Sequence, residues 1–142
     1  MSDENIESDR ELDEIQAIFF EECREGLAAA EAGLSQLAGG DSSPEAVAGV
    51  FRAVHSIKGG AGAFGHDALL TFAHAFENVL NKVRAGEIAA SPEIGQQLLS
   101  AFDILSDHVA AAMGQCDKPD DGTSLAALNG RSEEHTSELQ SH

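Results

Sequence analysis

The 142-residue sequence contains no tryptophan or tyrosine, and it holds only three prolines and two cysteines. With seven phenylalanines as its only aromatic residues and alanine abundant, the composition favours helices over sheets. Cys23 and Cys116 show no framework spacing, so we expect reduced thiols in a cytoplasmic protein. No apolar run is long enough to cross a membrane, and the polar start of the chain does not resemble a signal peptide.

Basic residues are also scarce, with 8 Lys and Arg against 25 Asp and Glu, which gives a formal net charge of -17. Such acidity argues against nucleic acid and anionic membranes as partners, and by itself it serves solubility. Between Glu45 and Asp67, however, there is no acidic residue, while Arg52 and Lys58 both occur there. The sequence therefore predicts a mildly positive region within a very acidic protein.

Apolar residues recur at helical spacing in four segments of the chain. These segments run from about Asp9 to Leu37, from Pro44 to about Phe64, from the turn at residues 65–67 to Ala85, and from Pro92 to about Met113. Ser8 and Glu11 have the spacing of a capping box, and Ser-Pro-Glu at residues 43–45 and 91–93 is a helix-start signal. The predicted fold is an all-α, antiparallel four-helix bundle.

The chain outside residues 9–113 lacks this pattern. We expect residues 1–8 to form a flexible N-terminus and residues 114–130 to form a linker. The last twelve residues, RSEEHTSELQSH, resemble the translation of a sequencing-library adapter, so we treat residues 131–142 as a non-native tail. In that case the natural chain can continue past residue 130, and His135 and His142 carry no functional meaning.

The candidate functional residues are concentrated in the stretch FRAVHSIKGGAGAFG, residues 51–65. On a helical wheel, His55 falls about 120° from the centre of the apolar stripe, so we expect it on the flank of its helix. Gly59, Gly60 and Gly62 follow, although each glycine in a helix costs about 1 kcal/mol relative to alanine. Glycines kept at this cost indicate a surface without side chains, which another molecule must approach closely.

A carboxylate is predicted beside this histidine. On the next helix Glu77 is displaced from the apolar stripe by about 100° in the same rotational sense as His55. The midpoint between positions 55 and 77 is His66, in the predicted turn, so an antiparallel hairpin places both side chains at the same height. Glu77 accepting Nδ1–H would fix the tautomer and leave Nε2 free to attack phosphorus. Lys58, one turn on, could balance the charge of an attached phosphoryl group.

Other interpretations of these residues remain open at this point. His55 and Glu77 could be an ordinary surface pair, and His74 a solvated neighbour that at most tunes the site. A zinc site from His55, His66 and His74 lacks any close ligand motif. The sequence contains no phosphate-binding loop, kinase glycine loop or serine-nucleophile elbow, so we do not expect this chain to bind or cleave ATP unaided.

The string H-S-I-K-G-G-A-G, followed by HAFEN at residues 74–78, closely resembles the histidine-containing phosphotransfer (HPt) domain at the N-terminus of CheA-type chemotaxis kinases. The resemblance covers about residues 9–113. It implies that His55 is the phosphorylated residue, and that Glu77 is its hydrogen-bond partner. The other implied roles are a polar shell, made by Lys58 and His74, and sites of partner access, at Gly59, Gly62 and Arg52.

The resemblance also implies a function. A separate CheA-type kinase domain, acting in cis or in trans with bound ATP and Mg²⁺, phosphorylates the histidine, and an aspartate of a CheY- or CheB-type response regulator then takes the phosphoryl group. The domain itself would bind no cofactor and would form part of a protein histidine kinase. Members of this family often have a fifth helix, for which only residues 124–129 offer a start. A non-catalytic acidic helical adaptor domain is the alternative function.

Overall fold

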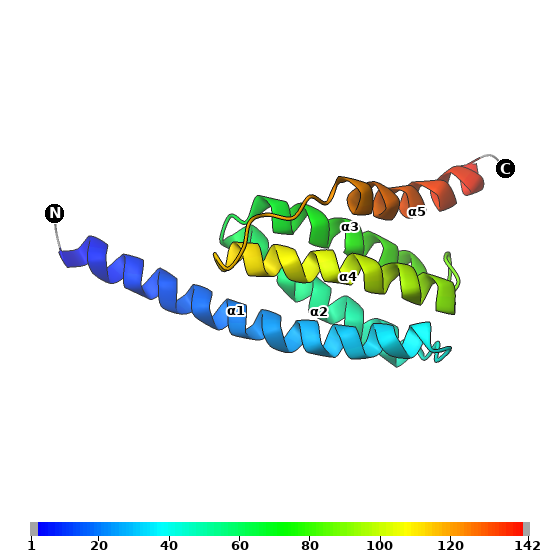
Figure 1. Cartoon of the computed structure of the whole chain (residues 1–142), viewed down its shortest axis with the longest axis horizontal. Coiled ribbons are helices and arrows are strands. Elements are labelled where there is room, and N and C mark those ends of the chain that lie inside the picture. The colour runs from blue at the N-terminus through cyan, green and yellow to red at the C-terminus, as the bar shows by residue number, and fades with distance from the viewer. Residues whose placement is uncertain (1–2, 141–142) are drawn as a thin grey trace.

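The computed structural model describes the backbone of residues 3–140 and the side chains of residues 10–132. Across this range the chain is helical, without strands. Its helices are α1 (Asp3–Ala38), α2 (Pro44–Ala63), α3 (Asp67–Arg84), α4 (Pro92–Ala112) and α5 (Gly122–Gln140). Helices α1 to α4 pack side by side as a bundle, and α5 lies mainly along α3 (Figure 1). The all-α bundle predicted from the sequence is confirmed.

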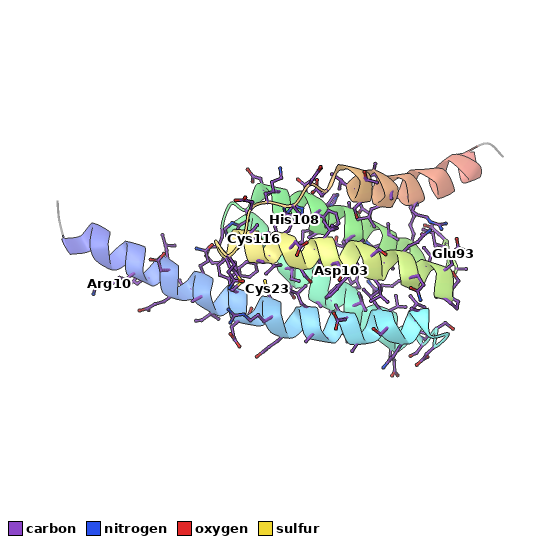
Figure 2. All side chains as sticks on the ribbon, viewed as in Figure 1. Arg10, Cys23, Glu93, Asp103, His108 and Cys116 are labelled. Carbon is purple, nitrogen blue, oxygen red and sulfur yellow. The ribbon has the colours of Figure 1, made fainter. Side chains whose placement is uncertain are left out.

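The core lies where the apolar stripes of α1 to α4 meet, as the periodicity predicted. Its largest fully buried apolar side chains include Leu34, Ile57, Phe72, Phe76, Leu98 and Leu105. Cys23 is also buried there, and burial raises the pKa of this thiol to about 12 (Figure 2). The thiol is therefore a protonated, packed group rather than a reactive one.

The start of α1 differs from the prediction. The backbone is already helical at Asp3, so Ser8 lies inside the helix and the predicted capping box there is wrong. The flexibility expected at the N-terminus stays a prediction. No proline or glycine stands between Asp3 and Cys23 to stop a helix. Ile15 and Ile18 share the helical spacing of the apolar residues in the first predicted segment. They are nevertheless exposed, because the N-terminal part of α1 extends past the end of the bundle (Figure 1).

The two Ser-Pro-Glu signals do begin helices, but their serines act differently. The Ser91 hydroxyl accepts a hydrogen bond from the backbone N–H of Ile94 at 3.2 Å, which caps α4 as predicted. The Ser43 side chain makes no such bond, and only its carbonyl accepts N–H groups of the first turn of α2. Asp67, expected in the turn, is the first residue of α3.

The linker predicted over residues 114–130 is helical from Gly122 onward. Leu128 is buried and Leu125 is half-buried against the core. Just before α5, Asp121 Oδ2 lies 2.7 Å from Nε2 of the buried His108 on α4. A weakly patterned segment thus becomes a helix because tertiary contacts stabilise it. The helix runs on through the adapter-like segment to Gln140, and the last two residues lie outside the described part.

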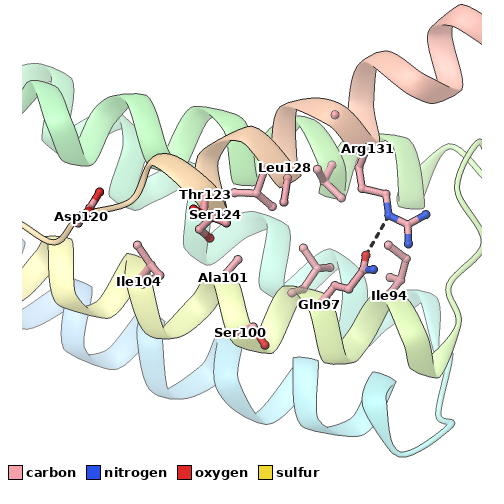
Figure 3. Close-up of a pocket in the computed structure, with 14 residues that line it drawn as sticks. Ile94, Gln97, Ser100, Ala101, Ile104, Asp120, Thr123, Ser124, Leu128 and Arg131 are labelled. Atoms are coloured by element: carbon pink, nitrogen blue, oxygen red, sulfur yellow. Dashed lines mark hydrogen bonds between the residues drawn. The ribbon is translucent and has the colours of Figure 1, made fainter.

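A pocket of about 790 Å³ lies between α4 and α5 (Figure 3). Apolar side chains such as Ile94, Ile104 and Leu128 line it, and Arg131 Nε donates a hydrogen bond to Gln97 Oε1 at 2.9 Å near one end. Because Arg131 is the first residue of the segment expected to be non-native, its contacts carry no functional argument. None of the helices in the described part of the chain is long and apolar enough to cross a membrane.

Candidate functional site

The α2–α3 hairpin brings His55 beside Glu77. The chain reverses at Gly65, whose φ of 76° is in the left-handed region that favours glycine, and the N–H of His66 closes the turn on the Ala61 carbonyl at 2.9 Å. His55 Nδ1 then lies 2.6 Å from Glu77 Oε2. The His55 side chain is 61% exposed, while that of Glu77 is only 7% exposed. The pairing and the flank position predicted from the helical wheel are confirmed.

Lys58 is the second partner of this carboxylate. Its Nζ donates a hydrogen bond to Glu77 Oε1 at 2.8 Å, so each carboxylate oxygen meets one donor. Burial raises the pKa of Glu77, but the hydrogen bonds from Lys58 and His55, together with their charges, outweigh this effect and hold the pKa below its usual value. Glu77 is therefore ionised at neutral pH.

The charge of Glu77 fixes the tautomer of His55. An ionised carboxylate can only accept hydrogen bonds, so Nδ1 of His55 must carry the proton. The lone pair then lies on Nε2, the ring nitrogen that is not turned towards Glu77. Because most of the His55 side chain is exposed, this nitrogen can be approached by a large partner. The arrangement suits a nucleophile that another protein must reach.

Lys58 and His74 lie on the same side of the hairpin, and their role as a polar shell stays a prediction. His74 is exposed, and both residues line a pocket of about 470 Å³ that α5 closes on its far side through Leu125 and Asn129. Lys58 is engaged with Glu77 in this structure, so its predicted contact with a phosphoryl group stays a prediction. Arg52 is exposed on α2, three residues before His55, and its role in partner access also stays a prediction.

The three glycines after His55 have different surroundings. A Cβ added at Gly59 would meet nothing within 4 Å, and one at Gly62 would only touch Leu70 at 3.8 Å. A Cβ added at Gly60 would instead overlap the Phe19 ring of α1. The expectation that Gly60 bares the surface around His55 is therefore wrong, because α1 packs against that side of α2. Gly59 and Gly62 remain without a packing reason to be glycine.

Phe51, which contacts the His55 ring, and Arg84, which contacts Phe51, were not predicted to belong to the site. The Phe51 ring stacks near-parallel to the His55 ring, with centroids 5.7 Å apart and an interplanar angle of 15°. The Arg84 guanidinium carbon lies 4.2 Å from the centroid of the Phe51 ring. The i, i+4 spacing of Phe51 and His55 was a usable signal, since such residues are neighbours on a helix.

The histidines considered for zinc are not gathered at one point. His66 Nε2 pairs with Gln16 Oε1 on α1, whereas Nδ1 of His55 faces Glu77. Within the part of the chain that the structure describes, no group of three or more His, Cys, Asp or Glu side chains is placed to hold a metal ion.

Known proteins are similar to this chain in sequence and in fold. Chemotaxis protein CheA of Rhizobium meliloti (strain 1021) is 50% identical over 102 residues, which are 72% of this chain and 14% of that protein. Chemotaxis protein CheA of Salmonella typhimurium is 36% identical over 101 residues, 71% of this chain and 15% of that protein. This chain therefore spans only a small part of the curated relatives that it matches.

A solved structure and a family model agree with these relatives. The crystal structure of the phosphorylated P1 domain of CheA3 in complex with CheY6 from R. sphaeroides has a TM-score of 0.71 and 28% identity to this protein, and the match covers 88% of this chain and 98% of that one. The family model described as Hpt domain matches residues 14–114, which include both His55 and Glu77. With its bundle, its exposed histidine and a match over most of its length, the chain belongs to the Hpt domain family.

Proposed function

We propose that this domain is a phosphorelay carrier in two-component chemotaxis signalling. His55 accepts a phosphoryl group from the ATP-dependent kinase domain of a CheA-type protein and passes it to an aspartate of a CheY- or CheB-type response regulator. The observation that carries the proposal is the 2.6 Å contact between Nδ1 of the exposed His55 and the buried, ionised Glu77. The names of the relatives, and the complex of the CheA3 P1 domain with CheY6, support the choice of partners.

Two transfer steps follow from this geometry. In the first, the Nε2 lone pair of His55 forms a bond to the γ-phosphorus of ATP as the bond from that phosphorus to the ADP oxygen breaks. The ring takes on positive charge, and its Nδ1 proton stays in the hydrogen bond to Glu77. In the second, a carboxylate oxygen of the regulator attacks the phosphorus, the N–P bond breaks and its electron pair returns to Nε2.

Lys58 and His74 support the His55–Glu77 pair. Lys58 keeps Glu77 ionised, and its ammonium has further N–H donors that can reach oxygens of the phosphoryl group one turn away. His74 contributes a polar side chain along the same pocket. The domain needs no cofactor of its own, because the partner kinase domain supplies ATP and Mg²⁺. An ATP-dependent donor and two free thiols are consistent with a location in the cytoplasm.

Radiolabelling tests the proposal directly. The domain is incubated with a CheA-type kinase domain and γ-labelled ATP, and the label is followed through acid and alkali, because a phosphohistidine is lost in acid and kept in alkali. His55→Gln should remove all acid-labile label while the helical circular dichroism stays unchanged, since the exposed side chain contributes little packing. His74→Gln, on the same side of the hairpin, should still carry acid-labile label at the end of the incubation.

Two results would contradict the assignment. Acid-labile label at the wild-type level on His55→Gln would place the nucleophile elsewhere. No label on the folded wild-type domain, with binding to the partner retained, would favour the non-catalytic acidic adaptor instead. Chasing the labelled domain with a CheY-type regulator then tests the second step, in which the label should move from the domain to the regulator.

A further inference from the structure

Two contacts of different kinds hold the His55 ring, a hydrogen bond and a ring stack. Its edge is hydrogen-bonded through Nδ1 to Glu77 at 2.6 Å, and its face stacks on the Phe51 ring at 5.7 Å with an interplanar angle of 15°. Phe51 in turn carries the guanidinium group of Arg84, whose Cζ is 4.2 Å from the ring centroid. The Phe51 ring thus contacts both the guanidinium group and the imidazole, and we call these three residues the Arg84–Phe51–His55 stack.

A hydrogen bond alone does not fix the direction in which Nε2 points. The imidazole turns about two side-chain torsions, whereas the contact with Glu77 restrains the distance of only one ring atom. One combination of the two torsions therefore stays free, and it lets the ring plane rock while Nδ1 keeps its distance from Glu77. Since the Nε2 lone pair lies in the ring plane, this rocking moves it off the axis of attack on phosphorus, and misaligned reactants lose rate. A flat neighbour on the ring face removes that freedom.

We infer that Phe51 is a positioning residue for phosphoryl transfer, holding the plane of the His55 ring so that Nε2 points along the line of attack, and that Arg84 in turn holds Phe51. This inference rests on the proposed function. Phe51 is half-buried and lies one helical turn before His55, where an i, i+4 neighbour meets it. It makes no contact with the phosphorus itself.

The position of Arg84 at the end of α3 explains how it can hold the Phe51 ring. It is the last residue of α3, where a cation is favoured by the negative end of the helix dipole. In the antiparallel hairpin this end of α3 lies beside the part of α2 that carries Phe51. A guanidinium over an aromatic face is attracted by the ring electrons and is itself flat, so it restrains the tilt of the Phe51 ring. Arg84 is exposed, so replacing it leaves the core intact.

The test measures kcat and KM for phosphorylation of the whole domain by a CheA-type kinase domain. Phe51→Leu should lower kcat by about tenfold and leave KM within about twofold, because the nucleophile is misdirected while the docking surface is kept. Phe51→Tyr keeps the flat face and should restore kcat. Arg84→Gln should lower kcat by about threefold at unchanged KM, and Arg84→Lys should recover part of it.

A matched control removes an aromatic ring elsewhere on the same segment. Phe64, at the end of α2, is also half-buried and stacks on Phe19 with centroids 5.5 Å apart, but it does not contact His55. Phe64→Leu should lower the melting temperature and leave kcat at the wild-type value. A nitrogen-15 NMR spectrum of Phe51→Leu should still show the proton on Nδ1, which separates loss of the stack from loss of the Glu77 bond.

Three results for the Phe51 variants would overturn the inference. Wild-type kcat in Phe51→Leu, a change in KM alone, or a Phe51→Tyr variant as slow as Phe51→Leu would overturn the inference. If Phe51→Leu does not fold, Arg84→Gln decides, and a wild-type kcat there overturns it. His55→Gln run alongside keeps the two proposals apart: if it loses all label while Phe51→Leu is normal, only the inference fails, and if it keeps its label, the proposed function fails.

Discussion

The carboxylate of Glu77 gives the sharpest test of the site, because its charge affects stability as well as chemistry. Glu77→Gln keeps the shape of the side chain and removes the negative charge that meets Lys58 Nζ at 2.8 Å and His55 Nδ1 at 2.6 Å. Hydrogen bonds to charged groups contribute about 1.5–3 kcal/mol, and breaking a fully buried ion pair costs about 3–5 kcal/mol. Lys58 is 23% exposed and His55 61%, so solvent replaces part of the lost interaction. We expect a loss of about 1–2 kcal/mol at neutral pH.

The pH dependence of this loss follows from the lowered pKa of Glu77. The unfolded chain has the usual carboxyl pKa, near the reference value of 4.5, and the folded protein a lower one, so in acid the unfolded state binds more protons. The stabilisation by Glu77 is therefore fully present above that reference value and is lost as the pH falls through the folded pKa. Glu77→Gln cannot titrate. The difference in unfolding free energy between wild type and variant should be constant at neutral pH and shrink in acid.

Urea unfolding followed by circular dichroism, in a series from about pH 7 to about pH 3, measures this difference. Glu87→Gln is the matched control, because Glu87 is well exposed and lies 3.4 Å from Lys82, so its loss should cost less than about 0.5 kcal/mol at any pH. A difference for Glu77→Gln that persists or grows below the usual carboxyl pKa would refute the ion-pair reasoning. A difference no larger than that of Glu87→Gln would refute the magnitude.

Two further predictions concern the glycines and the cysteines. Gly60→Ala should lower the free energy of unfolding by about 1–3 kcal/mol, because its Cβ would overlap the Phe19 ring, while Gly59→Leu should melt near the wild-type temperature and yet transfer phosphoryl slowly to a CheY-type regulator. Equal melting curves for both variants, or normal transfer by Gly59→Leu, would contradict this. A thiol reagent followed by mass spectrometry should label exposed Cys116 and spare Cys23 in the native protein, and should label both in urea.

The His55–Glu77 pair could be predicted from the sequence because it depends on local regularities. Helical periodicity gives the angle of each side chain, and a turn centred on His66 gives their common height. The structure then needs only an antiparallel hairpin to bring the two within 2.6 Å. Rotation and height are properties of two neighbouring helices, and neither requires knowledge of the rest of the bundle.

What the sequence could not supply depends on elements far along the chain. Gly59 and Gly60 lie about 100° apart on a wheel of α2, but the wheel does not show which flank another helix covers. The position of Phe19 on α1 makes Gly60 the packed glycine and leaves Gly59 open. The contact of His108 with Asp121, just before α5, joins two residues that belong to no recognisable sequence pattern. The contact of Lys58 with Glu77 rather than with solvent is set by flexible side-chain torsions, which periodicity does not describe.

If the proposed function holds, one contact accounts for both the uptake and the release of the phosphoryl group. As Nε2 of His55 bonds to phosphorus, the ring becomes positively charged, and an ionised Glu77 at 2.6 Å stabilises that charge. The same positive ring, with its proton held on Nδ1, is a better leaving group when the regulator's aspartate attacks. A neutral residue at position 77 would weaken both steps. The bond from Lys58, by lowering the pKa of Glu77, keeps the carboxylate charged throughout the exchange. In the proposed carrier, the same carboxylate thus assists both the uptake and the release of the phosphoryl group.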